Sequence, residues 1–202
     1  MLDLLINLDL SLFQFINNLT QKWWVFDLFG IFLADYFGYF LILAALFLIF
    51  KEKQFYQKAH FFSLLALSLI LSRGLIAEVI KFFVARPRPF SVLEIQPLVN
   101  YSDYDINMSF PSGHAAFYFA LAFAVFLYFS QSEDMAKKRL GLWFLAGASL
   151  IVVSRIFVGI HWPLDILVGA TIGIASVFVV KKLLDFEFKK NNAVTPITNE
   201  TN

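Results

Sequence analysis

Long apolar segments alternate with short charged clusters along this chain, and the apolar segments have the length needed to cross a lipid bilayer. A membrane-spanning helix needs about 20 predominantly apolar residues. The pattern predicts five such helices, at residues 23–50, 61–85, 112–129, 140–158 and 163–184. The first opens on two adjacent tryptophans, a feature typical of the membrane interface.

The two ends of the chain differ from this pattern. Residues 1–20 are apolar but interrupted by acids and amides, so we expect an amphipathic helix lying in the interface, with a sixth span as the alternative. Residues 189–202 are polar and are expected to form a disordered cytoplasmic tail. The sequence therefore predicts an all-α, polytopic transmembrane helix bundle of five spans plus an N-terminal interfacial helix, with one membrane-embedded domain over residues 1–188.

The composition agrees with a membrane protein and argues against a soluble domain, a nucleic-acid partner and cysteine-based chemistry. Of the 202 residues, 59% are hydrophobic and 15% are charged, whereas a soluble domain carries about 25% charged residues. A net charge of +1 gives no reason to expect a nucleic-acid partner. Because the chain has no cysteine, disulfides, thiolate metal sites and a cysteine nucleophile are excluded. The N-terminus lacks the basic start and small-residue cleavage site of a signal peptide, so the first span is expected to act as an uncleaved signal.

Basic residues are divided unequally between the two sides of the membrane. In the five-span arrangement ten of the 16 lysines and arginines share one side, which the positive-inside rule makes cytoplasmic. The polar loop 86–110 and the turn 159–162 then face outward from the cytoplasmic membrane. The ten residues are Lys51, Lys53, Lys58, Lys137, Lys138, Arg139, Lys181, Lys182, Lys189 and Lys190.

Three polar motifs lie where the spans end or begin. They occupy residues 81–89, 111–114 and 154–165. These positions are the end of the second span, the start of the third, the end of the fourth and the start of the fifth. All four places are on the outward face, so the motifs are expected to meet there.

The cations and the helix start in these motifs suit a phosphate group. The planar guanidinium groups of Arg88 and Arg155 match phosphate oxygens, and Lys81 adds a point charge. The segment containing Ser112 and Gly113 reads as the N-terminus of a helix, where free backbone N–H groups favour an anion. The sequence thus predicts an anion site that stabilises a transferring phosphoryl group.

Two histidines and an aspartate supply the reacting groups. His161 and Asp165 are four residues apart and share a face if a helix begins there. A carboxylate bonded to one ring nitrogen leaves the lone pair of the other free, which makes His161 a candidate nucleophile for phosphorus. His114 is the remaining candidate for proton transfer. No metal or other cofactor is required, because the cations and the helix N-terminus supply the electrostatics.

Together the three motifs resemble the signature of the type-2 phosphatidic acid phosphatase family, which includes bacterial lipid phosphatases. That signature is Lys, six residues, Arg-Pro; then Pro-Ser-Gly-His; then Ser-Arg, five residues, His, three residues, Asp. Every defined position matches within residues 81–165. The resemblance implies that His161 is the nucleophile, Asp165 its orienting partner and His114 the general acid and base. It also implies a phosphate-binding set of Lys81, Arg88, Ser112, Gly113 and Arg155.

The resemblance implies hydrolysis of a lipid phosphate or diphosphate at the extracytoplasmic face, with the lipid phosphate and membrane lipids as partners. This chain is short and has no soluble insertion, so it is similar to the small bacterial members of the family. Among the substrates of those members, undecaprenyl diphosphate is the one we expect. Phosphatidylglycerol phosphate and phosphatidic acid are the alternatives, as is a lipid phosphotransferase. A non-catalytic lipid-phosphate binding or transport protein is disfavoured, because binding alone needs neither histidine nor the aspartate. The sequence does not indicate the oligomeric state.

Three other charged residues near the motifs have structural interpretations, and a fourth has none. Arg86 flanks a proline at the interface and is expected to anchor the surface. Arg73 is expected to form an ion pair with a partner on another span, since an unpaired charge at this depth is costly. Glu78 lies three residues from Lys81 and is expected to orient its amine. Asp35, in the first span, has no evident partner in the sequence.

Overall fold

The protein is a bundle of helices in the computed structural model, which describes residues 2–102 and 104–194. Within those residues the secondary structure is helical throughout, without a strand. The elements are α1 (Leu2–Asn17), α2 (Trp24–Ile31), η1 (Phe32–Tyr36), α3 (Phe37–Lys51), α4 (Phe55–Leu69), η2 (Ile70–Ile76), α5 (Ala77–Val84), α6 (Pro89–Val92), α7 (Gly113–Ser130), α8 (Met135–Phe157) and α9 (Pro163–Val194).

Five helical segments of this part of the chain are long and apolar enough to cross a membrane, which confirms the predicted five-span bundle. They run over Trp24–Lys51, Phe55–Val92, Gly113–Ser130, Met135–Phe157 and Pro163–Phe186. The second and fourth begin earlier than predicted, because their first turns carry lysines and other polar side chains that can extend to the interface.

Helix α9 is longer than the sequence predicted. It continues to Val194, so residues 189–194 are helical and the expectation of disorder there is wrong. The reason is that the polar residues after Phe186 include no proline or glycine before the helix ends, and lysine has good helix propensity. The remainder of the predicted tail, residues 195–202, lies outside the described residues.

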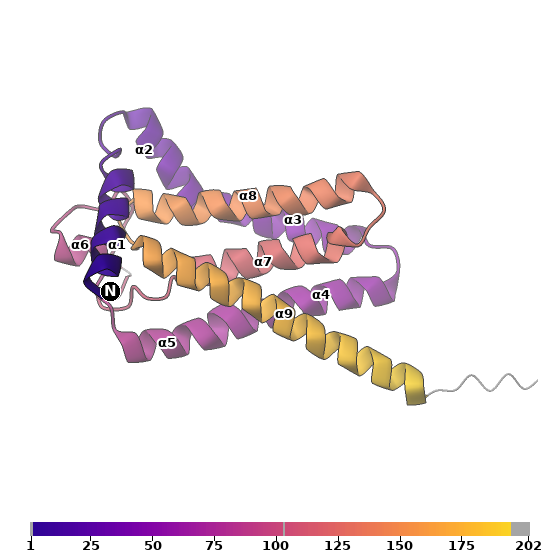
Figure 1. Cartoon of the computed structure of the whole chain (residues 1–202). Helices are drawn as coiled ribbons and strands as arrows, with labels where there is room; N and C mark the ends of the chain where they lie inside the picture. Colours follow the sequence, from indigo (N-terminus) through magenta and orange to yellow (C-terminus); the bar gives the residue numbers. More distant parts are fainter. Residues whose placement is uncertain (1, 103, 195–202) are drawn as a thin grey trace, which may run out of the picture.

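The predicted interfacial helix is α1. It has 16 residues and lies across one end of the bundle at a steep angle to the spans (Figure 1). It is not among the five candidate spans, so the six-span alternative is wrong. The ring of Phe13 packs on that of Trp162 with 5.2 Å between ring centroids, and Asn17 Nδ2 donates to the carbonyl of Phe157 at 2.8 Å. These contacts attach α1 to the end of α8 and the start of α9.

Small residues let α7 and α9 approach closely, and this contact places two of the predicted motifs side by side. A Cβ atom added at Gly169 would lie 2.4 Å from the carbonyl oxygen of Ser112, and one at Gly173 would lie 2.5 Å from that of Ala116. Close helix contact through glycine is the usual means of helix association in membranes. At the end of this contact Ser112 N–H donates to the carbonyl of Asp165 at 2.9 Å.

Two spans contain a π-helical turn, η1 in the first and η2 in the second. Turns of this kind are rare and often occur at functional sites. Asp35 lies in η1 and Arg73 lies in η2. Both turn toward the polar end of the bundle: Asp35 pairs with Arg155, and the Arg73 side chain lies against Gly113, where a Cβ would be 2.4 Å from Arg73 Nε.

The bundle has two chemically different ends. The α3–α4 and α7–α8 connections and the C-terminal part of α9 lie at the end opposite α1 (Figure 1), and these segments carry the ten basic residues that the sequence placed on one side. The three polar motifs lie at the other end, beside α1. The ten basic residues and the three motifs therefore lie at opposite ends of the bundle, as the span pattern predicted.

Candidate active site

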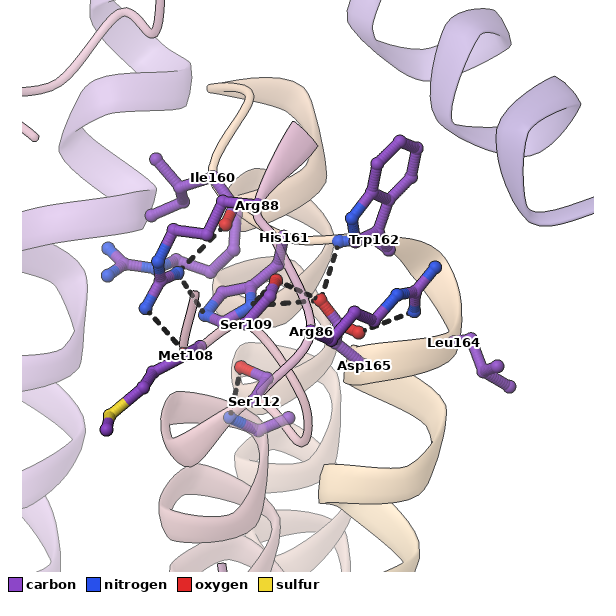
Figure 2. A network of polar contacts seen from close by, with 12 residues as sticks. Arg86, Arg88, Met108, Ser109, Ser112, Ile160, His161, Trp162, Leu164 and Asp165 are labelled. Carbon is purple, nitrogen blue, oxygen red and sulfur yellow. Dashed lines mark hydrogen bonds and ion pairs between the residues drawn. The ribbon is translucent and has the colours of Figure 1, made fainter. Parts of the chain in front are cut away.

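The predicted site residues gather at the end of the bundle beside α1, although they come from four helices and from the connections before α6, α7 and α9; Figure 2 shows four of them, Arg88, Ser112, His161 and Asp165. Seven of the eight are buried, and hydrogen bonds and ion pairs connect most of their side chains. The eight residues are Lys81 on α5, Arg88 before α6, Ser112, Gly113 and His114 at the start of α7, Arg155 on α8, His161 in the turn before α9 and Asp165 in the first turn of α9.

His161 and Asp165 form a buried pair. His161 Nδ1 lies 3.3 Å from Asp165 Oδ2, and the two side chains are 2% and 0% exposed. The condition for a shared helix face is not met, because α9 begins at Pro163 and His161 precedes it. The contact instead depends on the helix start. Asp165 is the third residue of α9 and accepts the backbone N–H of Trp162 at 3.0 Å, an arrangement like a capping box.

Burial controls the protonation of His161. It lowers the pKa of this imidazole to about 4; the hydrogen bond and charge of Asp165 oppose the shift, and the charges of Arg88 and Arg155 add to it. The ring is therefore neutral at pH 7. With the proton on Nδ1 facing Asp165, the lone pair of the neutral ring is on Nε2, which is the state that a nucleophilic histidine needs.

Asp165 is held by more groups than the sequence indicated. Oδ2 accepts from Ser109 Oγ at 2.5 Å, and Oδ1 pairs with Arg86 Nη1 at 2.7 Å (Figure 2). The prediction that Arg86 anchors the surface is wrong: its guanidinium also pairs with Asp9 and lies 5.1 Å from the ring of Trp162. Sequence reasoning missed Ser109 entirely. Its only local signal was its position just before the Pro-Ser-Gly-His motif.

Arg88 is fixed beside the other nitrogen of His161. Its Nη1 lies 3.4 Å from His161 Nε2 (Figure 2). Three of its N–H groups donate to backbone carbonyls, those of Asp105 at 2.9 Å, Ile160 at 2.9 Å and Met108 at 3.0 Å. These bonds orient the guanidinium before any ligand binds, so a positive charge lies next to the nitrogen that carries the lone pair.

Arg155 is the most deeply buried cation of the site, with 1% of its side chain exposed. Nη1 donates to Asp35 Oδ1 at 3.0 Å, so Asp35 has the partner that the sequence did not reveal. Nη2 donates to the hydroxyl of Tyr104 at 2.7 Å and lies 3.2 Å from His114 Nε2. Its Nε is buried without a hydrogen-bond partner among the described residues. A buried, unpaired guanidinium N–H is a donor available to an anion.

Lys81 and Arg73 lie on the second span near the start of α7. Lys81 is 8% exposed, and its Nζ is 3.7 Å from Glu78 Oε1, as expected for an orienting contact. Arg73 also pairs with Glu78, so the expectation of a partner on another span is wrong. The π-helical turn at η2 explains this, since it changes the register of side chains along the helix. One acid thus serves two cations near Gly113.

Ser112 is the N-cap of α7, as its position before a helix predicted. Its Oγ accepts the N–H of Ala115 at 3.3 Å (Figure 2). Its role in binding phosphate stays a prediction. Within residues 2–102 and 104–194, no group of three His, Asp or Glu side chains is arranged to hold a metal ion. Metal independence likewise stays a prediction.

An apolar cavity of about 620 Å³ lies apart from the polar network, between the end of α1, α2 and α8. None of the eight predicted site residues lines it. Its walls are formed by Ile16, Leu19, Lys22, Trp23, Phe26, Phe29, Gly30, Leu33, Leu150, Val153, Ser154 and Phe157. The predicted site residues therefore lie at the polar end of the bundle and not in this cavity.

The fold and the site define a polytopic helical membrane protein with a histidine–aspartate pair set among buried cations at one end. The chain belongs to the PAP2 superfamily, whose sequence pattern matches residues 61–189. The family resemblance predicted from the three motifs is thereby confirmed.

Relatives in this family match to different extents. The chain is 27% identical to the bacitracin transport permease protein BcrC of Bacillus licheniformis over 96% of this chain and 95% of that protein. It is 30% identical to phosphatidylglycerophosphatase B of Bacillus subtilis over 63% of this chain and 60% of that protein. It is 31% identical to undecaprenyl-diphosphatase of Sulfolobus acidocaldarius over 48% of this chain and 43% of that protein.

The fold has a counterpart among solved structures. The crystal structure of Aquifex aeolicus LpxE superposes with a TM-score of 0.68 and 30% identity, covering 87% of this chain and 95% of that one. Similarity at this level over nearly the whole of both chains supports one architecture for the two proteins.

Proposed function

We propose that this protein hydrolyses a phosphate or diphosphate group of a lipid through a phosphohistidine intermediate on His161. One observation carries the proposal: His161 Nδ1 lies on the buried carboxylate of Asp165 while Nε2 lies beside the guanidinium of Arg88. A neutral imidazole oriented in this way presents a lone pair where phosphate oxygens would be neutralised. Two of the relatives support the proposal, because their names are those of lipid phosphatases.

The first chemical step transfers the phosphoryl group to the enzyme. Nε2 of His161 attacks phosphorus, the N–P bond forms, and the bond from phosphorus to the leaving oxygen breaks. Arg88, Arg155 and Lys81 stabilise the equatorial oxygens, and Asp165 stabilises the imidazolium that results. His114, next to Arg155, gives its proton to the leaving oxygen.

The second step returns the enzyme to its starting state. His114, now neutral, takes a proton from water as the water oxygen attacks phosphorus, and the N–P bond breaks. Inorganic phosphate leaves and His161 is again neutral. The protein groups named here supply the electrostatics of both steps, so the proposal includes no metal.

The preferred substrate is undecaprenyl diphosphate, which would give undecaprenyl phosphate and inorganic phosphate. The name of the undecaprenyl-diphosphatase relative supports this choice. The site lies at the end of the bundle opposite the ten basic residues, so the positive-inside rule supports a site on the extracytoplasmic face of the cytoplasmic membrane. Phosphatidylglycerol phosphate is the second candidate, because another relative is a phosphatidylglycerophosphatase.

Purified full-length protein assayed against undecaprenyl diphosphate, phosphatidylglycerol phosphate and phosphatidic acid tests both substrate and reaction. The preferred substrate should have the highest kcat/KM. Replacement of the nucleophile, His161→Ala, should lower phosphate release by at least about 10³-fold, whereas His60→Ala on α4 should stay within about twofold of wild type. Radiolabelled substrate should leave acid-labile phosphate on wild-type protein and none on His161→Ala.

A transport or binding role is the alternative that one relative favours, since BcrC carries the name of a transport permease. A binding protein would retain the lipid phosphate without releasing inorganic phosphate, and His161→Ala would bind as wild type does. A phosphotransferase would move the label to an added lipid alcohol. Either result would replace the hydrolase proposal.

A further inference from the structure

Helix α1 has an unusual buried acid. Among residues 3–17 of this helix only Asp9 and Phe13 are buried, and their spacing of four places them on one face. Phe13 packs on Trp162, as an interfacial helix requires. Asp9 is different, because a carboxylate with 5% of its side chain exposed is costly unless it is paired.

Asp9 is paired twice, once with Arg86, which contacts Asp165, and once with the backbone of Leu164, which adjoins Asp165. Its Oδ1 accepts the backbone N–H of Leu164 at 2.7 Å, and its Oδ2 pairs with Arg86 Nη2 at 2.5 Å. Leu164 is in the first turn of α9, where N–H groups have no partner within the helix. Asp9 therefore supplies an acceptor to the same helix start that holds Asp165.

Arg86 connects this acid to the histidine–aspartate pair. One terminal nitrogen, Nη2, pairs with Asp9. The other, Nη1, pairs with Asp165 Oδ1 at 2.7 Å, the contact that Figure 2 shows. The remaining oxygen of Asp165 is bonded by Ser109 and lies against His161. The planar fork of arginine can hold two carboxylates in fixed directions, which a lysine ammonium cannot do.

We propose that Asp9 and Arg86 are positioning residues for the Asp165–His161 pair, and that α1 is therefore a part of the active site rather than a membrane anchor alone. Arg86 fixes the rotation of the Asp165 carboxylate, and Asp9 fixes Arg86 and balances its charge. Asp9 lies outside residues 61–189, which carry the family pattern. The inference rests on the proposed phosphatase function.

The test compares variants of the full-length protein in the phosphate-release assay. Arg86→Gln removes the bridge, and kcat should fall by roughly 30-fold with KM changed by less than about threefold, because partners of catalytic ligands typically contribute 10–100-fold. Asp9→Asn keeps an oxygen for Leu164 N–H but loses the charge facing Arg86, and kcat should fall by roughly tenfold. Arg86→Lys should recover only part of the activity that Arg86→Gln loses.

Asp3→Asn is the matched control. Asp3 is an exposed acid on the same helix, so this variant makes the same chemical change without touching the site. It should retain wild-type kcat and KM. All variants are compared per amount of folded protein, measured by size-exclusion chromatography and thermal unfolding. Asp9→Ala is a second variant at the same position and should lower kcat at least as much as Asp9→Asn.

A double variant separates positioning from structural support. If Asp9 acts through Arg86, adding Asp9→Asn to Arg86→Gln should lower kcat by no more than about twofold. Full additivity of the two losses, or an Asp9→Asn variant that matches Asp3→Asn, would overturn the inference. Wild-type protein that releases no phosphate from any of the three lipids would instead overturn the proposed function.

Discussion

The close packing of α7 against α9 predicts the effect of a substitution at Gly169, which lies nearly two turns into α9. Alanine at this position would place its Cβ 2.4 Å from the carbonyl oxygen of Ser112 and 2.9 Å from the Cβ of Ala115. Ordinary contact begins at 3.4 Å, so the two helices must separate by about 1 Å. The carbonyl oxygen of Ser112 is a backbone atom, so it cannot rotate away as a side chain could.

Two consequences follow for Gly169→Ala. Overpacking of this kind lowers the free energy of unfolding by about 1–3 kcal/mol. The same shift separates Ser112 from Asp165, which are joined by a hydrogen bond of 2.9 Å. Since a misplacement of about 1 Å at a reacting group can lower the rate by roughly 10²-fold, kcat should fall by up to that amount.

The measurements are the unfolding midpoint of detergent-solubilised protein and the initial rate of phosphate release. Gly74→Ala is the control, because a Cβ at Gly74 would meet no atom of a neighbouring helix within 4 Å. That variant should be as stable as wild type or slightly more so, since alanine has the higher helix propensity. A Gly169→Ala protein with wild-type midpoint and rate would refute the packing argument.

Three other predictions follow from the site. Ser109→Ala removes a donor from Asp165 and should lower kcat by roughly tenfold, whereas Ser130→Ala at the other end of α7 should have no effect; equal rates would contradict the role of Ser109. In NMR spectra of histidine-labelled protein, His161 should titrate near pH 4 rather than 6.5; the unfolded chain takes up this proton at higher pH, so stability should fall as pH drops from 6.5 to 4. A titration of His161 near 6.5 would contradict its burial. Phosphate release should continue at the full rate in excess EDTA, and strict dependence on Mg²⁺ would point to metal-assisted hydrolysis.

The bundle architecture and the grouping of the motifs were predictable because both depend on local signals. Apolar length identifies a span, and a polar motif at the end of a span has only two faces on which to lie. Once five spans were assigned, the motifs at residues 81–89, 111–114 and 154–165 had to share a face. The structure places them together at one end.

The partners of the site residues were not predictable in this way. Arg86 and Asp9 are separated by 77 residues, and Asp35 and Arg155 by 120. No sequence periodicity relates residues so far apart. The sequence therefore indicated that Arg86 anchors the surface and showed no partner for Asp35. Arg73 shows the converse: its partner is local, but the π-helical turn that places it against Glu78 has no simple sequence signal.

The sequence by itself determined that this is a five-span membrane protein of the PAP2 superfamily with three polar motifs on one face, because hydropathy and motif spacing are local properties of the chain. Only the tertiary structure decided how these motifs are held. Ser109 and Arg86 bond to Asp165, and Asp9 on the interfacial helix bonds to Arg86. These side chains are shielded from water at the end of the bundle, and a buried charge is costly unless it is paired. The partners are therefore the oppositely charged or polar groups that helix packing brings close, however distant they are in the sequence.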